Sequence, residues 1–473
     1  MGLVSGVLRT PFANSASANG KAQPEIVFVE APRVVGGELT KRFPQGSRLV
    51  RLAPGASPRS VINLTPELFG AADPQISFDA TKILFSGLKS PSARWQIWEM
   101  NTDGSDKLQL THCSGDCLRP AYLPRKQIVF TVITGKGSQR TSALYVSQRS
   151  GADAHPVTFG PGNFQVETVL RSGRVLVSAE SPLLGAGKGL GASTFFVMMP
   201  DGTGLSLFRW DVRRNLVRTG AEELDDGTVL FVERRYAAGR ETGGELAWIR
   251  PGALHNSLIT PPQSAYWSAH ELQGNTLVVA KQDSGSSASN GKFDLYTFDL
   301  KTKTPGQLIY RNQRFASVQA VPLEPQSVPQ HYWSILHPEE KTGRLICLNA
   351  YLSADAPHAR FTGHIARVRV ITLEQDENHE RVLGEAPVQT DGSFYIVVPA
   401  DQPVRFELLS AKGSVIHVQK SWIWVRPGED RGCLGCHESP ALAPENHWPL
   451  ALRRFDTPTP LGMPFPSQPI RHH

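Results

Sequence analysis

The sequence has no long hydrophobic run and little net charge, and each of these lacks excludes a class of protein. No stretch of eighteen apolar residues occurs among its 473 residues, so no transmembrane segment is expected. The net charge is +6, from 49 basic and 43 acidic residues, and basic pairs such as Arg213-Arg214 are scattered along the chain. This charge is too weak and dispersed for a nucleic-acid partner, and it favours at most acidic redox partners.

Cysteine is also scarce, but two of the five cysteines form a motif. The segment Cys433-Leu434-Gly435-Cys436-His437 reads C-x-x-C-H, the attachment signature of a c-type haem. Two thiols at this spacing can each bond one vinyl group of a porphyrin, and the adjacent imidazole can reach the iron. A zinc site would need a second ligand pair, and the nearest upstream cysteine, Cys347, stands alone; a redox C-x-x-C pair is the other alternative. The sequence therefore predicts one covalently bound haem c.

Cys113 and Cys117, separated by Ser-Gly-Asp, are the remaining close pair. In an oxidising compartment they could close a small disulfide loop, and otherwise they would be two reduced thiols in a turn. Cys347 is expected to stay free.

Covalent haem attachment places the mature protein outside the cytoplasm, so we expect an exported, bacterial periplasmic protein. Residues 1–23 are then a leader or a disordered N-terminus. The short apolar stretch Gly2–Leu8 and the small residues Ala16–Ala18 resemble parts of a signal peptide, but the stretch is too short and lacks a basic start. We therefore expect the signal peptide to be incomplete in this sequence.

A weak repeat runs from about residue 24 to 322, with a unit of roughly 45 to 55 residues. The clearest copy holds the strand-like runs Lys82–Ser86 and Trp95–Met100, followed by the turn dipeptide Asp103-Gly104. Six such units of four short strands predict an all-β fold with a six-bladed β-propeller. Because an open ring would leave an exposed edge, we expect Ala316–Val321 to return and complete the first blade. The alternative is an array of β-sandwiches.

The second unit carries a family resemblance. Its segments F-D-x-x-K-I-L-F, at Phe78–Phe85, and N-T-D-G, at Asn101–Gly104, resemble the TolB-type propeller.

The region after the repeats changes character. Residues 323–340 are proline-rich and are expected to form an extended linker. Alternating strand-like runs in residues 341–426 predict a small antiparallel β-sandwich. Residues 427–473 hold the haem motif and a proline-rich tail, which is expected to wrap the haem or the propeller.

A second resemblance covers most of the chain. The run Asp391–Pro399, the run Arg426-Pro-Gly-Glu429 and the run Arg431–Glu438 resemble the middle domain of the hydrazine synthase alpha subunit and its relatives. The resemblance implies a propeller, a middle sandwich domain and an exported haem protein whose partners are other subunits of a periplasmic complex or a redox protein. It also implies a haem in the active centre, with a tyrosine after the motif as iron ligand. No tyrosine follows Tyr395 in this sequence.

The second axial position of the iron decides what a haem can do, because a protein ligand favours electron transfer and an open site permits chemistry. His437 should be the proximal ligand. His447, Met463 and His417 are possible distal ligands, each with the alternative of a surface or packing role.

The aromatic residues Trp422, Trp424 and Trp448 are expected to pack around the porphyrin edge or in the sandwich core.

Three functions follow from these observations. The first is a monohaem c-type cytochrome that transfers electrons within a periplasmic redox complex, which the missing tyrosine favours. The second is a haem enzyme like hydrazine synthase, acting on a small nitrogen or oxygen species. The third is a propeller that binds proteins and carries a structural haem.

Overall fold

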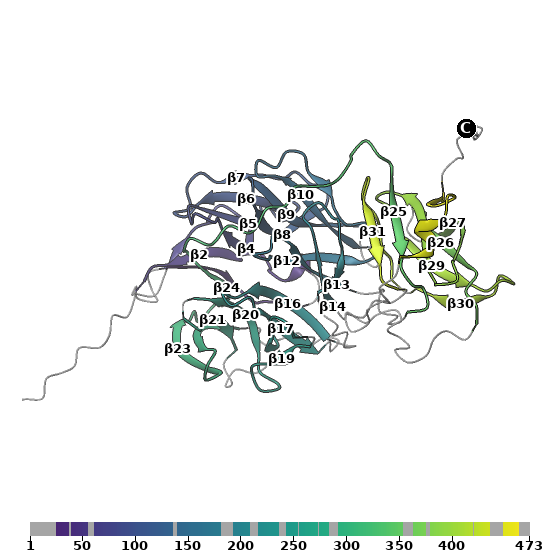
Figure 1. Cartoon of the computed structure of the whole chain (residues 1–473). Coiled ribbons are helices and arrows are strands. Elements are labelled where there is room, and N and C mark those ends of the chain that lie inside the picture. Colours follow the sequence, from purple (N-terminus) through teal and green to yellow (C-terminus); the bar gives the residue numbers. More distant parts are fainter. Residues whose placement is uncertain are drawn as a thin grey trace, which may run out of the picture.

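The computed structural model describes the chain as strands with two short 3-10 helices, η1 (Leu39–Lys41) and η3 (Leu450–Arg453) (Figure 1). The described residues are 25–36, 39–54, 61–135, 140–180, 193–208, 216–235, 243–253, 255–272, 274–282, 292–352, 363–374, 379–419, 421–435 and 448–462. Within these ranges, no helix is long and apolar enough to cross a membrane.

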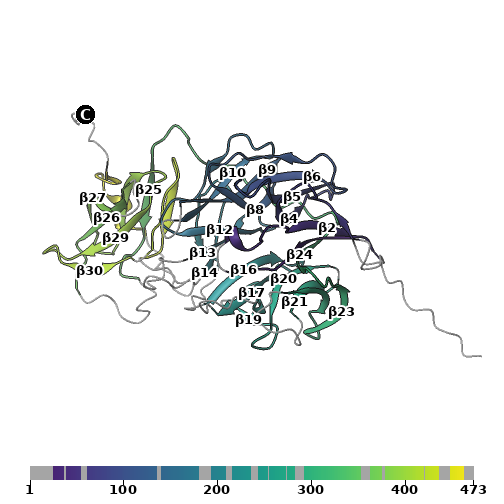
Figure 2. The same ribbon diagram turned by 180° about the vertical axis from the view of Figure 1, so that it is seen from behind.

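Six four-stranded sheets make up the propeller region. From the innermost strand outward they are β24 (Ala316–Pro322), β1 (Ile26–Ala31), β2 (Arg48–Leu52) and β3 (Ile62–Asn63); β4 (Gly70–Ile76), β5 (Lys82–Leu88), β6 (Gln96–Asn101) and β7 (Leu108–Gln109); β8 (Asp116–Leu123), β9 (Gln127–Thr134), β10 (Thr141–Gln148) and β11 (His155–Pro156); β12 (Asn163–Val169), β13 (Val175–Glu180), β14 (Ser193–Met198) and β15 (Ser206–Leu207); β16 (Leu216–Glu223), β17 (Val229–Arg235), β18 (Glu245–Ile249) and β19 (Ser257–Leu258); β20 (Tyr266–Glu271), β21 (Thr276–Lys281), β22 (Asp294–Asp299) and β23 (Thr304–Tyr310). Figures 1 and 2 show the inner strands around a common centre.

The return of the chain to the first sheet is confirmed. Strand β24 pairs antiparallel with β1, with Ile26 opposite Pro322 and Ala31 opposite Ala316. The unpaired edge that β1 would otherwise present is thereby covered.

Phenylalanine on the second strand of a sheet recurs in the propeller core. Phe28 on β1, Phe85 on β5, Phe130 on β9 and Phe231 on β17 are fully buried. Because blades stack face to face, the second strand is covered on both sides, which explains why such strands read as continuous apolar runs. The Asp103-Gly104 dipeptide makes the expected turn between β6 and β7, with Gly104 at a φ of 89°.

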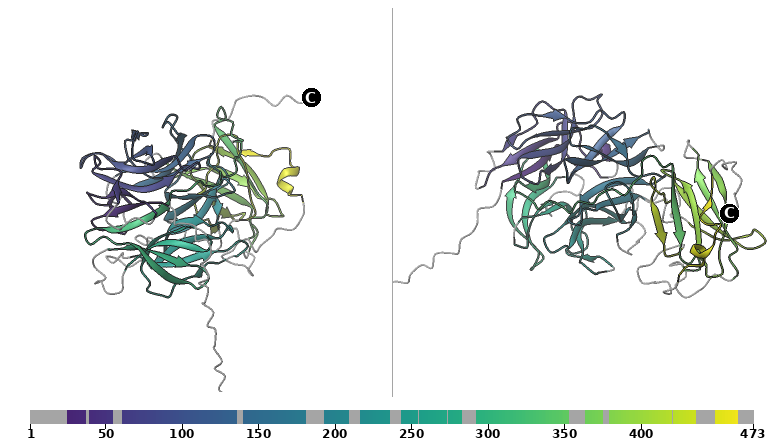
Figure 3. Two further views of the ribbon diagram at one scale, coloured as in Figure 1. Left: turned by 90° about the vertical axis from the view of Figure 1, so that its left-hand side faces the viewer. Right: turned by 45° about the horizontal axis from the view of Figure 1, so that its top comes forward.

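Two further sheets pack face to face beside the propeller and form the sandwich (Figure 3). One contains, in order, β31 (Asp430–Cys433), β25 (Thr342–Cys347), β28 (Phe394–Pro399) and β32 (Thr459–Pro460); the other contains β27 (Glu380–Pro387), β26 (Arg367–Leu373), β29 (Val404–Leu409) and β30 (Val415–Val418). Apolar side chains from both sheets, among them Ile396 and Phe406, form a shared core.

The expectation of a purely antiparallel sandwich is wrong. Strand β31 pairs parallel with β25, and β32 pairs parallel with β28. Residues 422–425, expected as a strand, contribute only an isolated bridge between Val404 and Ile423. The parallel strands have four and two residues, which is too short for periodicity to reveal.

The described part of the tail lies on the sandwich. The backbone N–H groups of Leu450 and Ala451 donate to Asp391 Oδ2 (2.8 Å) and Ser393 Oγ (2.9 Å). Residues 448–462 therefore contact the sandwich turn at Asp391–Ser393, which differs from the expected wrapping of haem or propeller.

The proline-rich stretch after β24 is extended and lies along the propeller. Its backbone N–H groups at Gln326 and Gln330 donate to the carbonyl oxygens of Phe78 (2.9 Å) and Arg171 (2.8 Å). Both acceptors lie in turns between the two innermost strands of a sheet. The linker thus crosses the propeller before it reaches the sandwich.

Candidate haem-attachment site

The first half of the C-x-x-C-H motif continues a strand of the sandwich. In the parallel pair β25–β31, Cys433 lies opposite Cys347. Beyond the strand, the N–H of Leu348 donates to the Cys433 carbonyl oxygen (2.9 Å), and that of Asn349 donates to the Leu434 carbonyl oxygen (3.3 Å). The backbone of the motif is therefore fixed to β25 as far as Leu434.

Cys433 is half-buried and packs against the sandwich core, whereas Cys347 is fully buried. A cavity of about 20 Å³ adjoins both cysteines and is also lined by Phe394, Phe406 and Gln419. Since a water molecule needs roughly 10–15 Å³ of such volume, the cavity holds one or two waters and no porphyrin. It is not a haem pocket.

Gly435 stands where no side chain fits. A Cβ atom at this position would lie 2.5 Å from the carbonyl oxygen of Leu352 and 2.8 Å from its Cβ atom. By contrast, a Cβ atom at Gly432 would have its nearest neighbour at 3.9 Å. The turn between the two motif cysteines therefore depends on glycine at its second position.

The segment before the motif is clamped to the propeller, which lies beside β31 in Figure 1. Arg426 donates from Nε to the Asp201 carbonyl oxygen (2.8 Å), and Arg431 donates from a terminal nitrogen to the Leu205 carbonyl oxygen (2.6 Å). Glu429 accepts from the backbone N–H of Gly204 (3.1 Å). These three side chains bind the turn between β14 and β15, and we call them the clamp.

Burial governs the electrostatics of the clamp. Glu429 also accepts from the N–H of Arg426 (2.7 Å), yet burial raises the pKa of its carboxyl group above the usual range. Burial likewise raises the pKa of Asp401, opposed by its ion pair with Arg426 (2.6 Å). Two backbone N–H groups replace the water that Glu429 loses, so the carboxylate is held in place although it is buried.

Trp424 belongs to the propeller side of this junction. Its side chain is fully buried, packs edge-on against Phe164 at a centroid distance of 5.5 Å, and donates from Nε1 to the Gly202 carbonyl oxygen (3.2 Å). The expectation that it packs at the porphyrin edge or in the sandwich core is therefore corrected. Trp448 is 62% exposed.

Most predicted iron ligands fall outside the described residues. These are Cys436, His437, His447 and Met463. His417 is described: it lies on β30 opposite Leu408, two residues before the cavity-lining Gln419 and on the same face. Among the described residues, no three His, Cys, Asp or Glu side chains gather as a metal site.

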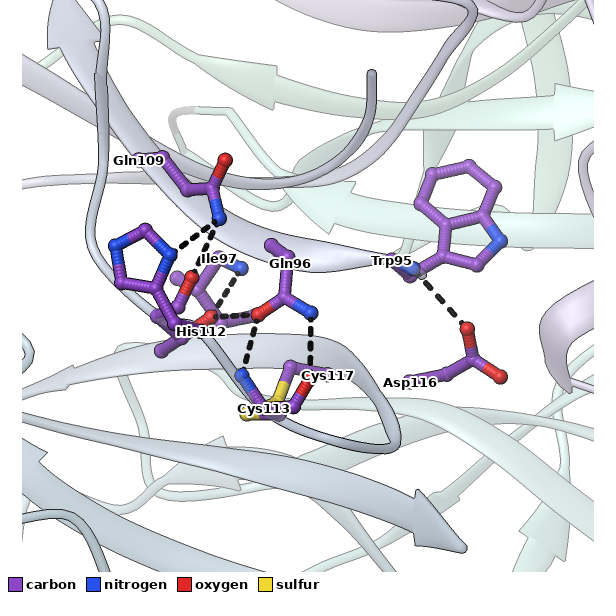
Figure 4. Close-up of a disulfide and its surroundings, with 9 residues drawn as sticks. Trp95, Gln96, Ile97, Gln109, His112, Cys113, Asp116 and Cys117 are labelled. Carbon is purple, nitrogen blue, oxygen red and sulfur yellow. Dashed lines mark hydrogen bonds between the residues drawn. A yellow bond between two sulfur atoms is a disulfide. The ribbon is translucent and has the colours of Figure 1, made fainter. Parts of the chain in front are cut away.

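Cys113 and Cys117 are joined as a disulfide at the start of β8, with their Cα atoms 6.5 Å apart. Figure 4 shows how the Gln96 amide holds this loop: its oxygen accepts from the Cys113 N–H (2.9 Å), and its nitrogen donates to the Cys113 carbonyl oxygen (3.1 Å). The loop lies in the propeller, away from the C-x-x-C-H motif.

Sequence reasoning found the clamp residues only as letters of a family signature. Their role was missed because each contacts a turn more than two hundred residues upstream in the chain. A signal was present in the sequence, since three charged residues follow the apolar run Trp422–Val425, and buried charges need partners.

Comparisons with known proteins agree with this geometry. Residues 356–438 match the family model of the hydrazine synthase alpha subunit middle domain. The hydrazine synthase subunit alpha of Kuenenia stuttgartiensis is 21% identical over 87% of this chain, and the chain spans 66% of that relative's length.

Solved structures give the same result for the fold. The chain is similar to hydrazine synthase of Kuenenia stuttgartiensis with a TM-score of 0.80 and 19% identity, over 92% of this chain and 71% of that one. A weaker likeness, with a TM-score of 0.44 and 14% identity, links it to TolB from Acinetobacter baumannii over 63% of this chain and 66% of that one. The family-model match contains the whole C-x-x-C-H motif, and the chain belongs to the hydrazine synthase alpha-like family.

Proposed function

We propose that the chain carries one haem c, bonded to Cys433 and Cys436, with His437 as the proximal iron ligand. The observation that carries this proposal is the match of residues 356–438 to a hydrazine synthase alpha domain, because that match ends one residue after His437. The donor set fits the group, since two thiols and an imidazole at this spacing suit a c-type haem.

The placement of Cys433 supports the same proposal. Its backbone is fixed to β25 through the parallel ladder, while its side chain is only half-buried. A thiol that is held in position and still reachable can be alkylated by a vinyl group. A bound haem supplies an iron whose sixth position takes a protein ligand or stays open to a small molecule.

We further propose that this haem serves an exported haem enzyme of the hydrazine synthase type, acting on a small nitrogen or oxygen species together with other subunits. The hydrazine synthase alpha likeness favours an enzyme subunit over a free cytochrome. The Cys113–Cys117 disulfide agrees with an oxidising compartment such as the periplasm.

Electron transfer is the second candidate. It is favoured by the sequence after Tyr395, which offers no tyrosine as iron ligand but does offer His447 and Met463. A histidine or methionine on the distal side would complete a six-coordinate iron, which suits a carrier.

The domain layout belongs to the proposal as well. The six sheets of residues 24–322 are taken as six blades, residues 323–340 as the linker, residues 341–426 as the sandwich, and residues 427–473 as the haem segment with its tail. The parallel strands β31 and β32 extend one sheet of the sandwich across that last boundary.

Haem attachment is tested by mass and spectrum on the full chain matured in a bacterial periplasm. We expect the denatured polypeptide to be heavier by one haem, and the double variant Cys433→Ala with Cys436→Ala to carry none. Haem that leaves the wild-type chain on denaturation would contradict covalent attachment.

Carbon monoxide separates the two candidate functions. If the reduced wild-type protein binds carbon monoxide readily and is high-spin, the enzyme proposal holds and the carrier proposal fails. If it is low-spin and resists carbon monoxide, the carrier proposal holds, and His447→Ala should open the site. The exposed His112, which contacts Gln109 in the propeller, gives a matched control in His112→Ala.

A further inference from the structure

A cavity of about 100 Å³ lies where the inner strands of the propeller meet. Four arginines, Arg42, Arg119, Arg218 and Arg234, line it, and no carboxylate is among its described lining residues. Arg42 follows η1, in the connection between β1 and β2, and the other three come from β8, β16 and β17. Four sections of the chain thus send guanidinium groups to one small space.

A backbone irregularity turns inner-strand residues toward the propeller centre. Each of the six inner strands has one more residue than its neighbour between two paired positions, which defines a β-bulge. At three of these bulges, Asp73, Arg119 and Gln319 have φ values of 55°, 52° and 53°. Residues with a side chain adopt this conformation only when their surroundings hold them in it, and such residues cluster at ligand sites.

Hydrogen bonds between sheets hold the bulges. Gln319 accepts from the Asp73 N–H (3.0 Å) and donates from Nε2 to Asp73 Oδ1 (2.9 Å), while the Arg119 N–H donates to Asp73 Oδ2 (3.2 Å). Two sheets away, the Gly220 N–H donates to Glu167 Oε2 (2.8 Å). The wall of the cavity is therefore rigid before any ligand arrives.

Carboxylates beside the cavity orient the guanidinium groups. Arg119 makes a bidentate pair with Glu167 (2.9 and 2.7 Å), and Glu167 also accepts from Ser178 Oγ (2.6 Å). Arg42 donates to Asp73 (2.8 Å), which also accepts from Ser86 Oγ (2.9 Å).

Arg218 donates from Nε to Glu233 (2.9 Å), so four guanidinium groups meet three carboxylates. One positive charge remains in excess among these seven groups.

Arg42 provides a donor that the protein does not use. Its Nε atom is buried and has no hydrogen-bond partner within the described residues, although a buried donor of this kind normally finds one. Burial lowers the pKa of Arg42, the Asp73 carboxylate opposes this, and the charge of Arg119 lowers it further. An anion in the cavity would satisfy the Nε donor and offset the repulsion between the two arginines.

We infer that this propeller cavity is a binding site for one small oxyanion, a carboxylate or an inorganic oxyanion of a few heavy atoms. A volume of about 100 Å³ compares with roughly 30 Å³ for each water in the liquid, which suits an anion of that size. The planar donors of arginine match two oxygens of such an ion at once. This site is separate from the C-x-x-C-H motif and does not rest on the proposed function.

The test uses the full chain and two probes, sodium phosphate and sodium acetate, with sodium chloride at equal ionic strength as reference. We expect saturable one-to-one binding of phosphate or acetate by calorimetry and a rise in melting temperature, with no such effect of chloride. The two probes distinguish an inorganic ligand from a carboxylate.

Variants decide whether binding occurs in this cavity. Arg42→Gln should weaken binding at least tenfold, and Arg250→Gln, at an exposed propeller arginine that stacks on Trp248, should leave it unchanged. If Arg42→Gln does not fold, Arg42→Lys keeps a charge beside Asp73, removes the Nε donor and should also weaken binding.

Three results would overturn the inference. They are a wild-type protein that binds neither probe, an effect that chloride reproduces at equal ionic strength, and Arg42 variants that bind as tightly as the wild type.

Discussion

The propeller and the sandwich recruit neighbouring strands in different ways. Five propeller sheets each consist of four strands consecutive in sequence, and all pairings in the propeller are antiparallel. The sandwich sheet that carries Cys433 instead has the order β31-β25-β28-β32, with both outer strands parallel to their neighbours. Propeller order follows from local sequence, whereas the position of the haem motif depends on segments far apart in the chain.

The junction between the two regions shows the same contrast. The clamp residues Arg426, Glu429 and Arg431 reach back to a propeller turn, so the strand with the motif is held by two partners, β25 on one side and the propeller on the other. Each prediction below disturbs one partner of this comparison.

The largest effect is expected from removing the strand that joins the ring ends. Deletion of Ala316–Val321 strips β1 of its partner, and we expect a chain that aggregates because unpaired backbone groups seek another strand. Size-exclusion chromatography and thermal melting measure the outcome.

A milder version of this test uses one substitution. Val318→Asp places an unpaired charge at a fully buried position of β24, which costs about 3–5 kcal/mol, while Leu308→Asp on the outer strand β23 changes a side chain that is 47% exposed. Equal melting temperatures for the deletion variant and the wild type would show that β24 does not stabilise the ring.

An intermediate effect is expected at the motif turn. Gly435→Ala forces a Cβ atom to within 2.5 Å of the Leu352 carbonyl oxygen, so the turn after Cys433 must shift, at a cost of about 1–3 kcal/mol. We expect a smaller fraction of chains with covalent haem, measured by intact mass.

Gly432→Ala is the matched control, because its Cβ atom meets nothing closer than 3.9 Å. Similar haem content in both alanine variants would mean that the geometry of the turn does not govern attachment.

The smallest effect concerns pH. Because burial raises the pKa of Glu429, the native state binds more protons than the unfolded state at pH values just above the ordinary carboxyl pKa. The free energy of unfolding should therefore fall as pH rises through that window, by at most about 1.4 kcal/mol per unit.

Glu429→Gln should reduce this slope, measured by denaturant unfolding at several pH values. Glu339→Gln, at a side chain that is 72% exposed, is the control. A slope that stays the same in Glu429→Gln would assign it to other groups.

Much of the propeller was predictable because its signals are local. The apolar run Lys82–Ser86 and the dipeptide Asp103-Gly104 define strands and turns within a few residues, and the need to cover an edge indicated the return of Ala316–Val321. The all-β fold, the TolB-like propeller and the hydrazine synthase alpha resemblance are confirmed.

The sandwich was less predictable because its last strands depend on tertiary partners. Asp430–Cys433 has no alternating pattern, since its burial is set by β25 and the propeller rather than by one apolar face. Trp424 looked like a sandwich or haem residue, because nothing in its local sequence identifies Phe164 as its neighbour. The cavity arginines were likewise unnoticed, since bulges in separate sheets bring them together.

The parallel pairing of β25 and β31 has a consequence for the order of folding. About eighty residues separate the end of β25 from the start of β31, and closing so long a loop is slow and entropically costly. Propeller strand β24 ends more than a hundred residues before Cys433, so during synthesis the ring can fold first. The turn between β14 and β15 is then a preformed template on which the nascent segment Arg426–Arg431 docks, and the propeller acts as an internal folding aid for the strand that carries the motif.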